Sequence, residues 1–285
     1  MEYSTGAEKS PYDLRTFSYE PTLGAKKGGV RYKAKDILDQ SKVGICTSIS
    51  LTQNARKATG KDYSADFQYL LQKLHVGNWD EGSSLSTALK VARNIGMLPE
   101  KHWTHTTFAD RKLGYTKYVK KLQAVTPAEI ERLKKLCVKI KAYAKVPVDR
   151  DSLSNAIDES KAGVLARFDL GSEWWRKPIE PVRPPKKVIS GHAITLSNYD
   201  GGSFRIANTW GDDWADLGTA YHLLHQYSPT EAWLPYYNEV PEFIEVKLDN
   251  RTALMGKLLD ALQTLLALLQ KNKRTRGVII SPIII

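Results

Sequence analysis

Cysteine is the scarcest reactive residue in this 285-residue sequence, which contains only Cys46 and Cys137. Two cysteines form at most one bridge, so the sequence excludes a fold that depends on a disulfide framework. Hydrophobic residues make up 42% of the chain, which is enough for a packed core and excludes wholesale disorder. We therefore expect a globular protein that does not need an oxidising compartment.

Long apolar runs are absent as well. No stretch of about 18 uncharged apolar residues occurs, so the sequence predicts no transmembrane span. The first residues lack the basic and apolar regions of a secretory signal peptide. Apart from His192, the histidines have no cysteine or carboxylate partners at metal-ligand spacing, so we expect neither a metal nor another cofactor.

Acidic residues are outnumbered, since 31 Asp and Glu stand against 42 Lys and Arg, which gives a net charge of +11. Such a balance indicates either a polyanionic partner or a solvated basic surface. None of the usual nucleic-acid-binding motifs is present, so we favour the solvated surface and expect no specific nucleic-acid partner.

Helical apolar spacing dominates the first half of the chain, whereas short apolar segments bounded by Gly and Asp follow after about residue 146. This segregation predicts an α+β chain with two lobes. The predicted helices cover 45–58, 64–74, 84–95 and 127–144, and the predicted strands cover 163–169, 192–199, 203–208 and 219–224.

Cys46 begins the first predicted helix, where the positive end of the helix dipole favours a thiolate. Gln40 lies six residues earlier, and its amide together with the Cys46 backbone N–H can hold a developing oxyanion. A lone cysteine is more often a core residue than a nucleophile, and Cys137 is expected to be that case. Its register with Leu133 and Ile140 predicts a buried, inert thiol.

Gly191-His192-Ala193 opens an apolar segment, and Asn208 ends the next one. Adjacent strands would bring His192 beside Asn208, whose amide oxygen can accept the imidazole N–H and fix the tautomer. The other ring nitrogen would then face the thiol. A nucleophile, a base and an orienting group are the parts that covalent hydrolysis requires.

Three blocks of the sequence resemble papain-like cysteine peptidases. The run from Gln40 to Cys46 is similar to the family's Gln-x-x-x-Gly-x-Cys loop, and Gly191-His192-Ala193 resembles its His-Ala strand. Asn208-Thr209-Trp210-Gly211, followed by Trp214 and Gly218, resembles its Asn-Ser-Trp-Gly block. The resemblance covers about residues 11–235.

The resemblance implies a two-lobed fold in residues 1–245, with a polypeptide substrate bound in the cleft between the lobes. The helical lobe would cover about 40–145, and an antiparallel β-barrel lobe would combine about 1–39 with 146–245. It also implies that Cys46 attacks a peptide carbonyl while His192 transfers the proton and Asn208 orients His192.

Further roles follow from the same resemblance. Gln40 and the Cys46 N–H would bind the oxyanion, and Trp210 would shield the Asn–His contact from water. Gly82, Ser83 and Gly191 are the expected contacts to the substrate backbone.

The sequence also departs from the family pattern. Thr47 and Ala215 stand where secreted members have Trp and Gly, and the structural disulfides of those members have no counterparts. Only 45 residues precede Cys46, so the family's long inhibitory propeptide is expected to be missing. These departures fit a bacterial or phage-type member.

Two other functions stay open. A catalytically quiet papain-fold module would serve in binding or virion assembly, anchored by its carboxy-terminal helix. A cell-wall cross-peptide hydrolase would be attracted to an anionic envelope by the basic charge. The expected location is cytoplasmic or virion-associated.

Residues 246–285 lie outside the resemblance and are predicted to form an amphipathic helix and an apolar tail. The leucine stripe in 253–270 suits self-association, partner docking, a membrane surface or packing on the chain's own lobes. The basic residues in 271–276 suit an anionic surface, and the uncharged end at 277–285 is a candidate self-inhibitor.

Overall fold

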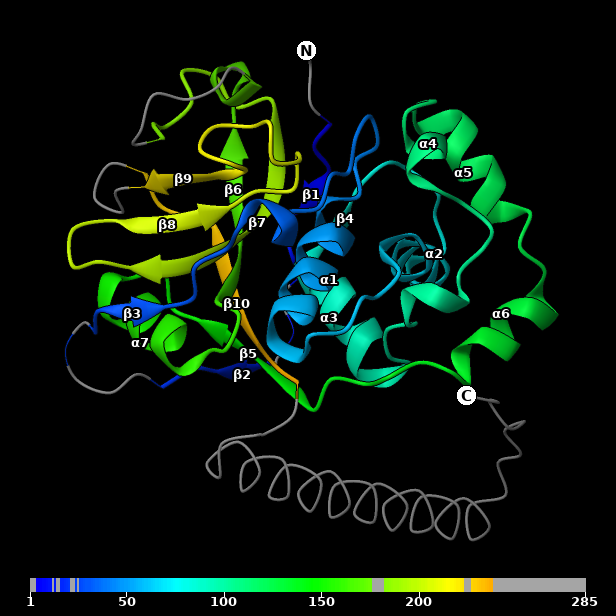
Figure 1. Ribbon diagram of the computed structural model, residues 1–285, viewed down its shortest axis with the longest axis horizontal. Coiled ribbons are helices and arrows are strands. Elements are labelled where there is room, and N and C mark those ends of the chain that lie inside the picture. The colour runs from blue at the N-terminus through cyan, green and yellow to red at the C-terminus, as the bar shows by residue number, and fades with distance from the viewer. Residues whose placement is uncertain are drawn as a thin grey trace, which may run out of the picture. The chain divides into compact units, whose positions relative to one another are not determined.

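The computed structural model describes residues 4–11, 13, 16–20, 24, 26–175, 182–222 and 227–237. The chain divides into two compact units, Met1–Glu239 and Val240–Ile285. The second unit, and with it the helix and tail predicted for 246–285, lies outside the described residues. Figure 1 shows the first unit as a group of helices beside a twisted sheet.

The first three predicted helices are confirmed. Helix α1 covers Cys46–Thr59, α2 covers Ala65–Val76 and α3 covers Leu85–Asn94. Ser64 caps α2 as expected, because its side chain accepts a hydrogen bond from the Phe67 N–H. The apolar faces of the three helices meet in one buried core, which includes Ile49, Phe67, Leu70, Leu71 and Val91.

The helix predicted at 127–144 is wrong in its second half. Helix α6 covers only Pro127–Lys134, and strand β5 begins at Ala142 and ends at Val146. Between them Val138 bridges to Met97, which ties the chain down as extended backbone. The β-branched side chain of Val138 favours that conformation. Cys137 is only partly buried here, so the prediction of a buried cysteine is also wrong.

The four predicted strands are confirmed with small shifts at their ends. Strands β6 (Val164–Leu170), β7 (Ser190–Tyr199), β8 (Phe204–Ala207) and β9 (Thr219–His222) are antiparallel neighbours. The sequence analysis missed β5 and β10 (Glu231–Tyr236). The strand order is β2-β5-β10-β6-β7-β8-β9, with β3 paired to β7. Helices combined with a mostly antiparallel sheet confirm the predicted α+β class.

Helix α1 lies between α2 and the sheet (Figure 1). Its sheet-facing side forms a second core, in which Cys46 and Leu51 join Leu165 of β6 and Ala193 of β7. The beginning of α1 therefore meets the strand that carries His192. The remaining elements are β1 (Ala7–Glu8), β2 (Phe17–Ser18), β3 (Gly28–Gly29), β4 (Ser83–Ser84), α4 (Phe108–Arg111), α5 (Tyr115–Gln123), α7 (Arg150–Glu159) and 3-10 turns at Ala34–Asp36, Glu100–His102 and Ser172–Trp175.

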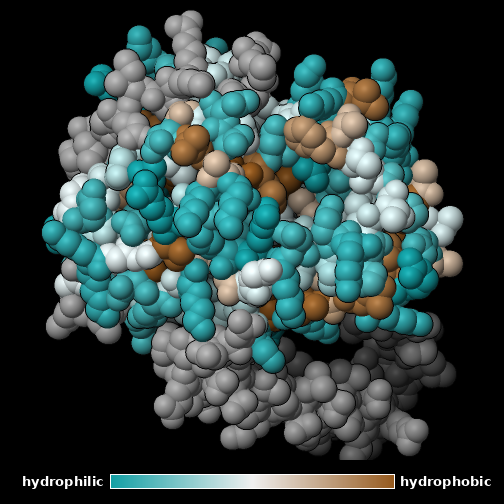
Figure 2. All heavy atoms as spheres, in the orientation of Figure 1, coloured by the Kyte–Doolittle hydropathy of each residue, from teal (hydrophilic) through white to brown (hydrophobic). Residues whose placement is uncertain are grey.

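The visible surface is mostly hydrophilic, with apolar residues in small separate areas (Figure 2). Small, separate apolar areas are normal for a folded domain and mark no large docking face. Among the described residues, no helix is both long and apolar enough to cross a membrane.

Candidate active site

Cys46 is the first residue of α1 and is fully buried. Burial raises the pKa of its thiol to about 12, and hydrogen bonding from the Ala193 backbone only partly opposes that rise. The thiol is therefore neutral in this structure, although it stands at a helix N-terminus.

His192 and Asn208 form a direct pair on β7 and just after β8. The distance between His192 Nε2 and Asn208 Oδ1 is 2.7 Å. Trp210 stacks on the imidazole at 4.4 Å between ring centroids, and the Thr209 N–H also donates to Asn208 Oδ1. Burial lowers the pKa of His192 to about 4, although the bond to Asn208 opposes the shift. Nε2 is engaged by Asn208, whereas the other ring nitrogen, Nδ1, makes no hydrogen bond to any described residue.

Gln40 connects the loop before α1 to the block after β8. Its backbone N–H donates to Thr209 O at 2.9 Å, and the Thr209 hydroxyl donates to Gln40 Oε1 at 2.8 Å. With Oε1 held in this way, Nε2 faces the Val43 carbonyl at 3.0 Å and the Ser4 carbonyl at 2.7 Å. Two segments that lie far apart in the sequence thus fix the amide donor beside Cys46.

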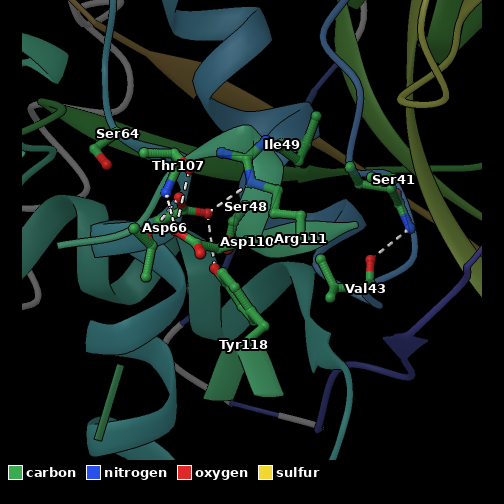
Figure 3. A network of polar contacts seen from close by, with 12 residues as sticks. Ser41, Val43, Ser48, Ile49, Ser64, Asp66, Thr107, Asp110, Arg111 and Tyr118 are labelled. Carbon is green, nitrogen blue, oxygen red and sulfur yellow. Dashed lines mark hydrogen bonds and ion pairs between the residues drawn. The ribbon is translucent and has the colours of Figure 1, made fainter. Parts of the chain in front are cut away.

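A buried ion pair in the helical part supports the same loop. Arg111 donates to Asp66 at 2.8 Å and to the Asp39 carbonyl, next to Gln40, at 3.0 Å. Figure 3 shows Arg111 and Tyr118 both pointing at Asp66. A buried charge pair needs such additional hydrogen bonds to offset its desolvation, and here one of them reaches the loop of the site.

The site is occupied by the chain's own residues 4–8, which we call the N-terminal segment. Strand β1 of this segment pairs in parallel with β4, and the Ser83 N–H donates to Gly6 O at 2.8 Å. The Gly6 N–H donates to Gly191 O at 3.1 Å. At the other end, Ser4 O accepts from Trp210 Nε1 at 2.9 Å as well as from Gln40.

Gly6 allows the N-terminal segment to approach this closely. A Cβ on Gly6 would lie 2.5 Å from the carbonyl oxygen of Gly44, which real structures do not tolerate. A Cβ on Gly82 would in turn lie 2.5 Å from Gly6 O. The segment and the site walls are therefore in backbone-to-backbone contact.

Arg167 also reaches the N-terminal segment. It lies on β6 opposite Ala193 of β7, and its Nε donates to Ala7 O at 2.8 Å. A second edge of the guanidinium binds Asp169 and Thr230, each at 2.7 Å.

Solved structures place this arrangement in a known fold. Xylellain, a cysteine protease from Xylella fastidiosa, superposes with a TM-score of 0.68 at 21% identity, covering 83% of this chain and 97% of that chain. The chain has the fold of papain-like cysteine proteases. Digestive procathepsin L 3 of Tenebrio molitor larval midgut gives a TM-score of 0.54 at 15% identity, covering 82% of this chain and 75% of that chain.

Procathepsin B S9 of Trypanosoma congolense also gives a TM-score of 0.54 at 15% identity, covering 81% of this chain and 86% of that chain. No protein family and no curated protein matches the sequence. The papain-like fold is therefore recognised through structure and not through overall sequence similarity.

Within this papain-like fold, the eight residues singled out from the sequence all lie around the N-terminal segment or the His–Asn pair. They are Cys46, His192, Asn208, Gln40, Gly82, Ser83, Trp210 and Gly191. The sequence analysis missed Arg167 and the N-terminal segment. An arginine in the middle of a mostly apolar strand was a signal for the first, whereas the segment carries no motif.

Among the described residues, no group of three His, Cys, Asp or Glu side chains is arranged to hold a metal ion. The functional groups that the site offers are a thiol, an imidazole and amides.

Proposed function

We propose that the protein is a cysteine peptidase that hydrolyses peptide bonds through a thioacyl intermediate on Cys46. The N-terminal segment is the observation that carries this proposal. It is an extended polypeptide that lies at the site with one carbonyl on Gln40 Nε2 and another on the Ser83 N–H. A site that holds one peptide backbone in this way suits a polypeptide substrate, and the shared fold supports the same reaction.

In the first half of the reaction, His192 removes the thiol proton and Cys46 Sγ attacks the peptide carbonyl carbon. Gln40 Nε2 and the Cys46 N–H stabilise the oxyanion that forms. The tetrahedral intermediate collapses, His192 gives its proton to the leaving amine, and an acyl group remains on Sγ.

In the second half, His192 takes a proton from water while the water oxygen attacks the thioester. Collapse of the second intermediate releases the carboxylic product, and the thiolate recovers a proton from His192. Asn208 keeps the imidazole in one tautomer through both halves, because its Oδ1 accepts from Nε2.

The N-terminal segment also makes the protein latent in this proposal. It covers the oxyanion donor, and the buried pair is left as a neutral thiol and a neutral imidazole, with pKa values of about 12 and about 4. Displacement of the segment would rehydrate both groups and favour the reactive ion pair. A short segment of the chain itself would thus act as an inhibitor of the site.

Labelling with an epoxide thiol inhibitor tests the proposal. We expect covalent modification of Cys46 in a Gly6→Ala chain, whose added Cβ displaces the N-terminal segment, and none in the Gly6→Ala/Cys46→Ala double variant. Cys137→Ala is the matched control and should leave labelling unchanged. The Gly6→Ala chain should also cleave denatured casein.

Two outcomes would contradict a peptidase. Absence of labelling at pH 6–7 in the Gly6→Ala chain would favour the quiet binding or assembly module. Loss of turbidity of purified cell walls, without cleavage of denatured protein, would favour the cell-wall hydrolase.

The contacts predicted for 253–270 and 271–276, and the inhibitory role predicted for 277–285, concern residues outside those described. They stay predictions. Deletion of 277–285 should raise activity on small peptides if that end acts as an inhibitor, and kinetics identical to those of the full chain would reject this role.

A further inference from the structure

Arg167 is a buried charge in β6, a strand whose other residues except Asp169 are apolar. It is 6% exposed, whereas its neighbours Ala166 and Phe168 on β6 are at most 1% exposed. A buried guanidinium is costly unless its N–H groups are paired. The hydrogen-bond partners of Arg167 therefore indicate its function.

The two edges of the guanidinium have different partners. Nη1 donates to the carboxylate of Asp169 and to the hydroxyl of Thr230, both of which belong to the sheet part of the site. Nε, on the opposite edge, donates to Ala7 O of the N-terminal segment. The edge formed by Nε and Nη2 thus faces the peptide that occupies the site.

Gly191 leaves room for this arrangement. A Cβ at Gly191 would lie 2.3 Å from Arg167 Nη2 and 2.0 Å from Ala7 O. Because Gly191 has no side chain, the Nε–Nη2 edge of Arg167 can contact the peptide bound at the site. Arg167 is also near enough to the nucleophile for its charge to oppose the rise in the pKa of Cys46 that burial causes.

The occupant of this edge in the structure is a poor match for it. Two parallel N–H groups of a guanidinium bind a carboxylate in a bidentate manner, which is stronger than a bond to one neutral carbonyl. Ala7 offers a single carbonyl oxygen, and Asp169 neutralises the charge only from the other edge. A substrate carboxylate has two oxygens and could accept hydrogen bonds from both Nε and Nη2, whereas the Ala7 carbonyl has one.

We propose that Arg167 determines substrate specificity by binding an aspartate or glutamate side chain of the substrate through its Nε–Nη2 edge. The inference rests on the proposed peptidase activity and names the substrate class of the same site. The N-terminal segment indicates how far Arg167 lies from the oxyanion donor along a bound peptide. Ser4 O accepts a hydrogen bond from Gln40, and Ala7 O accepts one from Arg167. The acidic residue is therefore within about three residues of the cleaved bond, at one position.

The test uses the full-length Gly6→Ala chain, so that the N-terminal segment no longer competes. A peptide mixture is digested, and the products are sequenced by mass spectrometry on both sides of each cut. Peptides with Glu or Gln at the enriched position are then compared. We expect kcat/KM to be about 10-fold higher for Glu than for Gln, as one charge-assisted pair would give.

Three variants in the Gly6→Ala background assign this ratio to Arg167. Arg167→Gln should reduce the Glu-to-Gln ratio to about 1. Arg167→Lys should keep part of the ratio, because lysine keeps the positive charge but lacks the two parallel N–H groups of the guanidinium. Arg205→Gln is the matched control, since Arg205 is another largely buried arginine of the sheet, and its side chain contacts Asp216, Thr219 and Tyr221, which are not part of the site. The ratio is insensitive to a general loss of folded enzyme, which lowers both rates equally.

The outcomes separate this inference from the proposed function. Cleavage without an acidic preference, or a preference that survives in Arg167→Gln, overturns the inference while the peptidase stands. No cleavage and no labelling of Cys46 overturns the peptidase, and the inference with it.

Discussion

The two walls of the candidate site differ in what their polar groups bind. On the sheet wall, His192 and Asn208 bind each other and are covered by Trp210. On the helical wall, the Gln40 amide and the Ser83 N–H bind the N-terminal segment. The His–Asn pair is complete by itself, whereas Gln40 and Ser83 on the helical wall, and Trp210 and Gly191 beside the pair, all bind the N-terminal segment. The proposed latency would thus act on peptide binding, while the His–Asn geometry is assembled in advance.

The largest effect is expected where the helical wall meets the N-terminal segment. Gly6→Ala places a Cβ against Gly44 O and should break several hydrogen bonds to the segment. Since each such bond stabilises by about 1 kcal/mol, we expect epoxide labelling of Cys46 to accelerate about 100-fold at pH 7. Gly202→Ala is the control, because its Cβ would meet only Asp200 Oδ1 at 3.7 Å. An unchanged labelling rate in Gly6→Ala would show that the segment does not block the site.

The sheet wall should make stability depend on pH. The pKa of His192 is lowered to about 4 by burial, so between pH 6.5 and 4 the unfolded chain binds a proton that the folded chain does not. The stabilisation is present above pH 6.5 and is lost as the pH falls. At pH 5 this one group should cost about 2 kcal/mol relative to pH 7, a factor of about 30 in the unfolding equilibrium.

Urea unfolding at pH 7 and pH 5 measures this dependence. His192→Gln should flatten the profile, although some dependence will remain because burial also lowers the pKa of His222 to about 4. His75→Gln, which changes an exposed histidine, should leave the profile as it is. A profile that is equally steep in His192→Gln would mean that His192 is not buried in the neutral form.

A smaller effect is expected when the sheet wall loses its orienting group. Asn208→Ala in the Gly6→Ala background should lower kcat about 10-fold, because the imidazole is no longer held in one tautomer. Labelling of Cys46 should remain detectable, since the thiol and the oxyanion donors are intact. Equal turnover with and without the Asn208 amide would contradict the proposed triad.

The smallest effect is expected at the hydrogen bond between Thr209 and Gln40, which connects the two walls. Thr209→Val in the Gly6→Ala background removes the hydroxyl that holds Gln40 Oε1 and leaves the side-chain shape nearly the same. We expect kcat to fall about threefold, the size of one neutral hydrogen bond, with KM unchanged. Thr52→Val, which removes a hydroxyl that bonds only within α1, is the control. A change in KM alone would place Thr209 in substrate binding instead.

The sequence was sufficient for the elements that local rules define. Helix α2 begins directly after the predicted Ser64 cap. Strand β7 coincides with the apolar run that starts at Gly191. The positions of Cys46, His192 and Asn208 were readable because each lies at the end of an element that the sequence marks clearly. Motif spacing then identified the loop and block that bring them together.

The sequence was not sufficient where contacts between distant segments determine the local structure. The helix predicted at 127–144 stops early because Val138 pairs with Met97, and helical periodicity carries no information about that partner. The N-terminal segment has no periodic pattern at all, and its place is fixed by backbone bonds to Ser83 and Gly191. Such bonds join backbone groups, so apart from the close approach that Gly6, Gly82 and Gly191 permit, they depend on the shape of the folded site.

The bonds between Gln40 and Thr209 join positions separated by 169 residues. Contacts of such long range form late in folding, because most of the chain must be ordered before the loop between them can close. A nascent chain therefore acquires the Gln40–Thr209 contact and its His–Asn pair only after nearly all of the first unit has been synthesised. Residues 4–8 are synthesised before the other residues of the site, so the N-terminal segment is already present at the moment when the site closes around it.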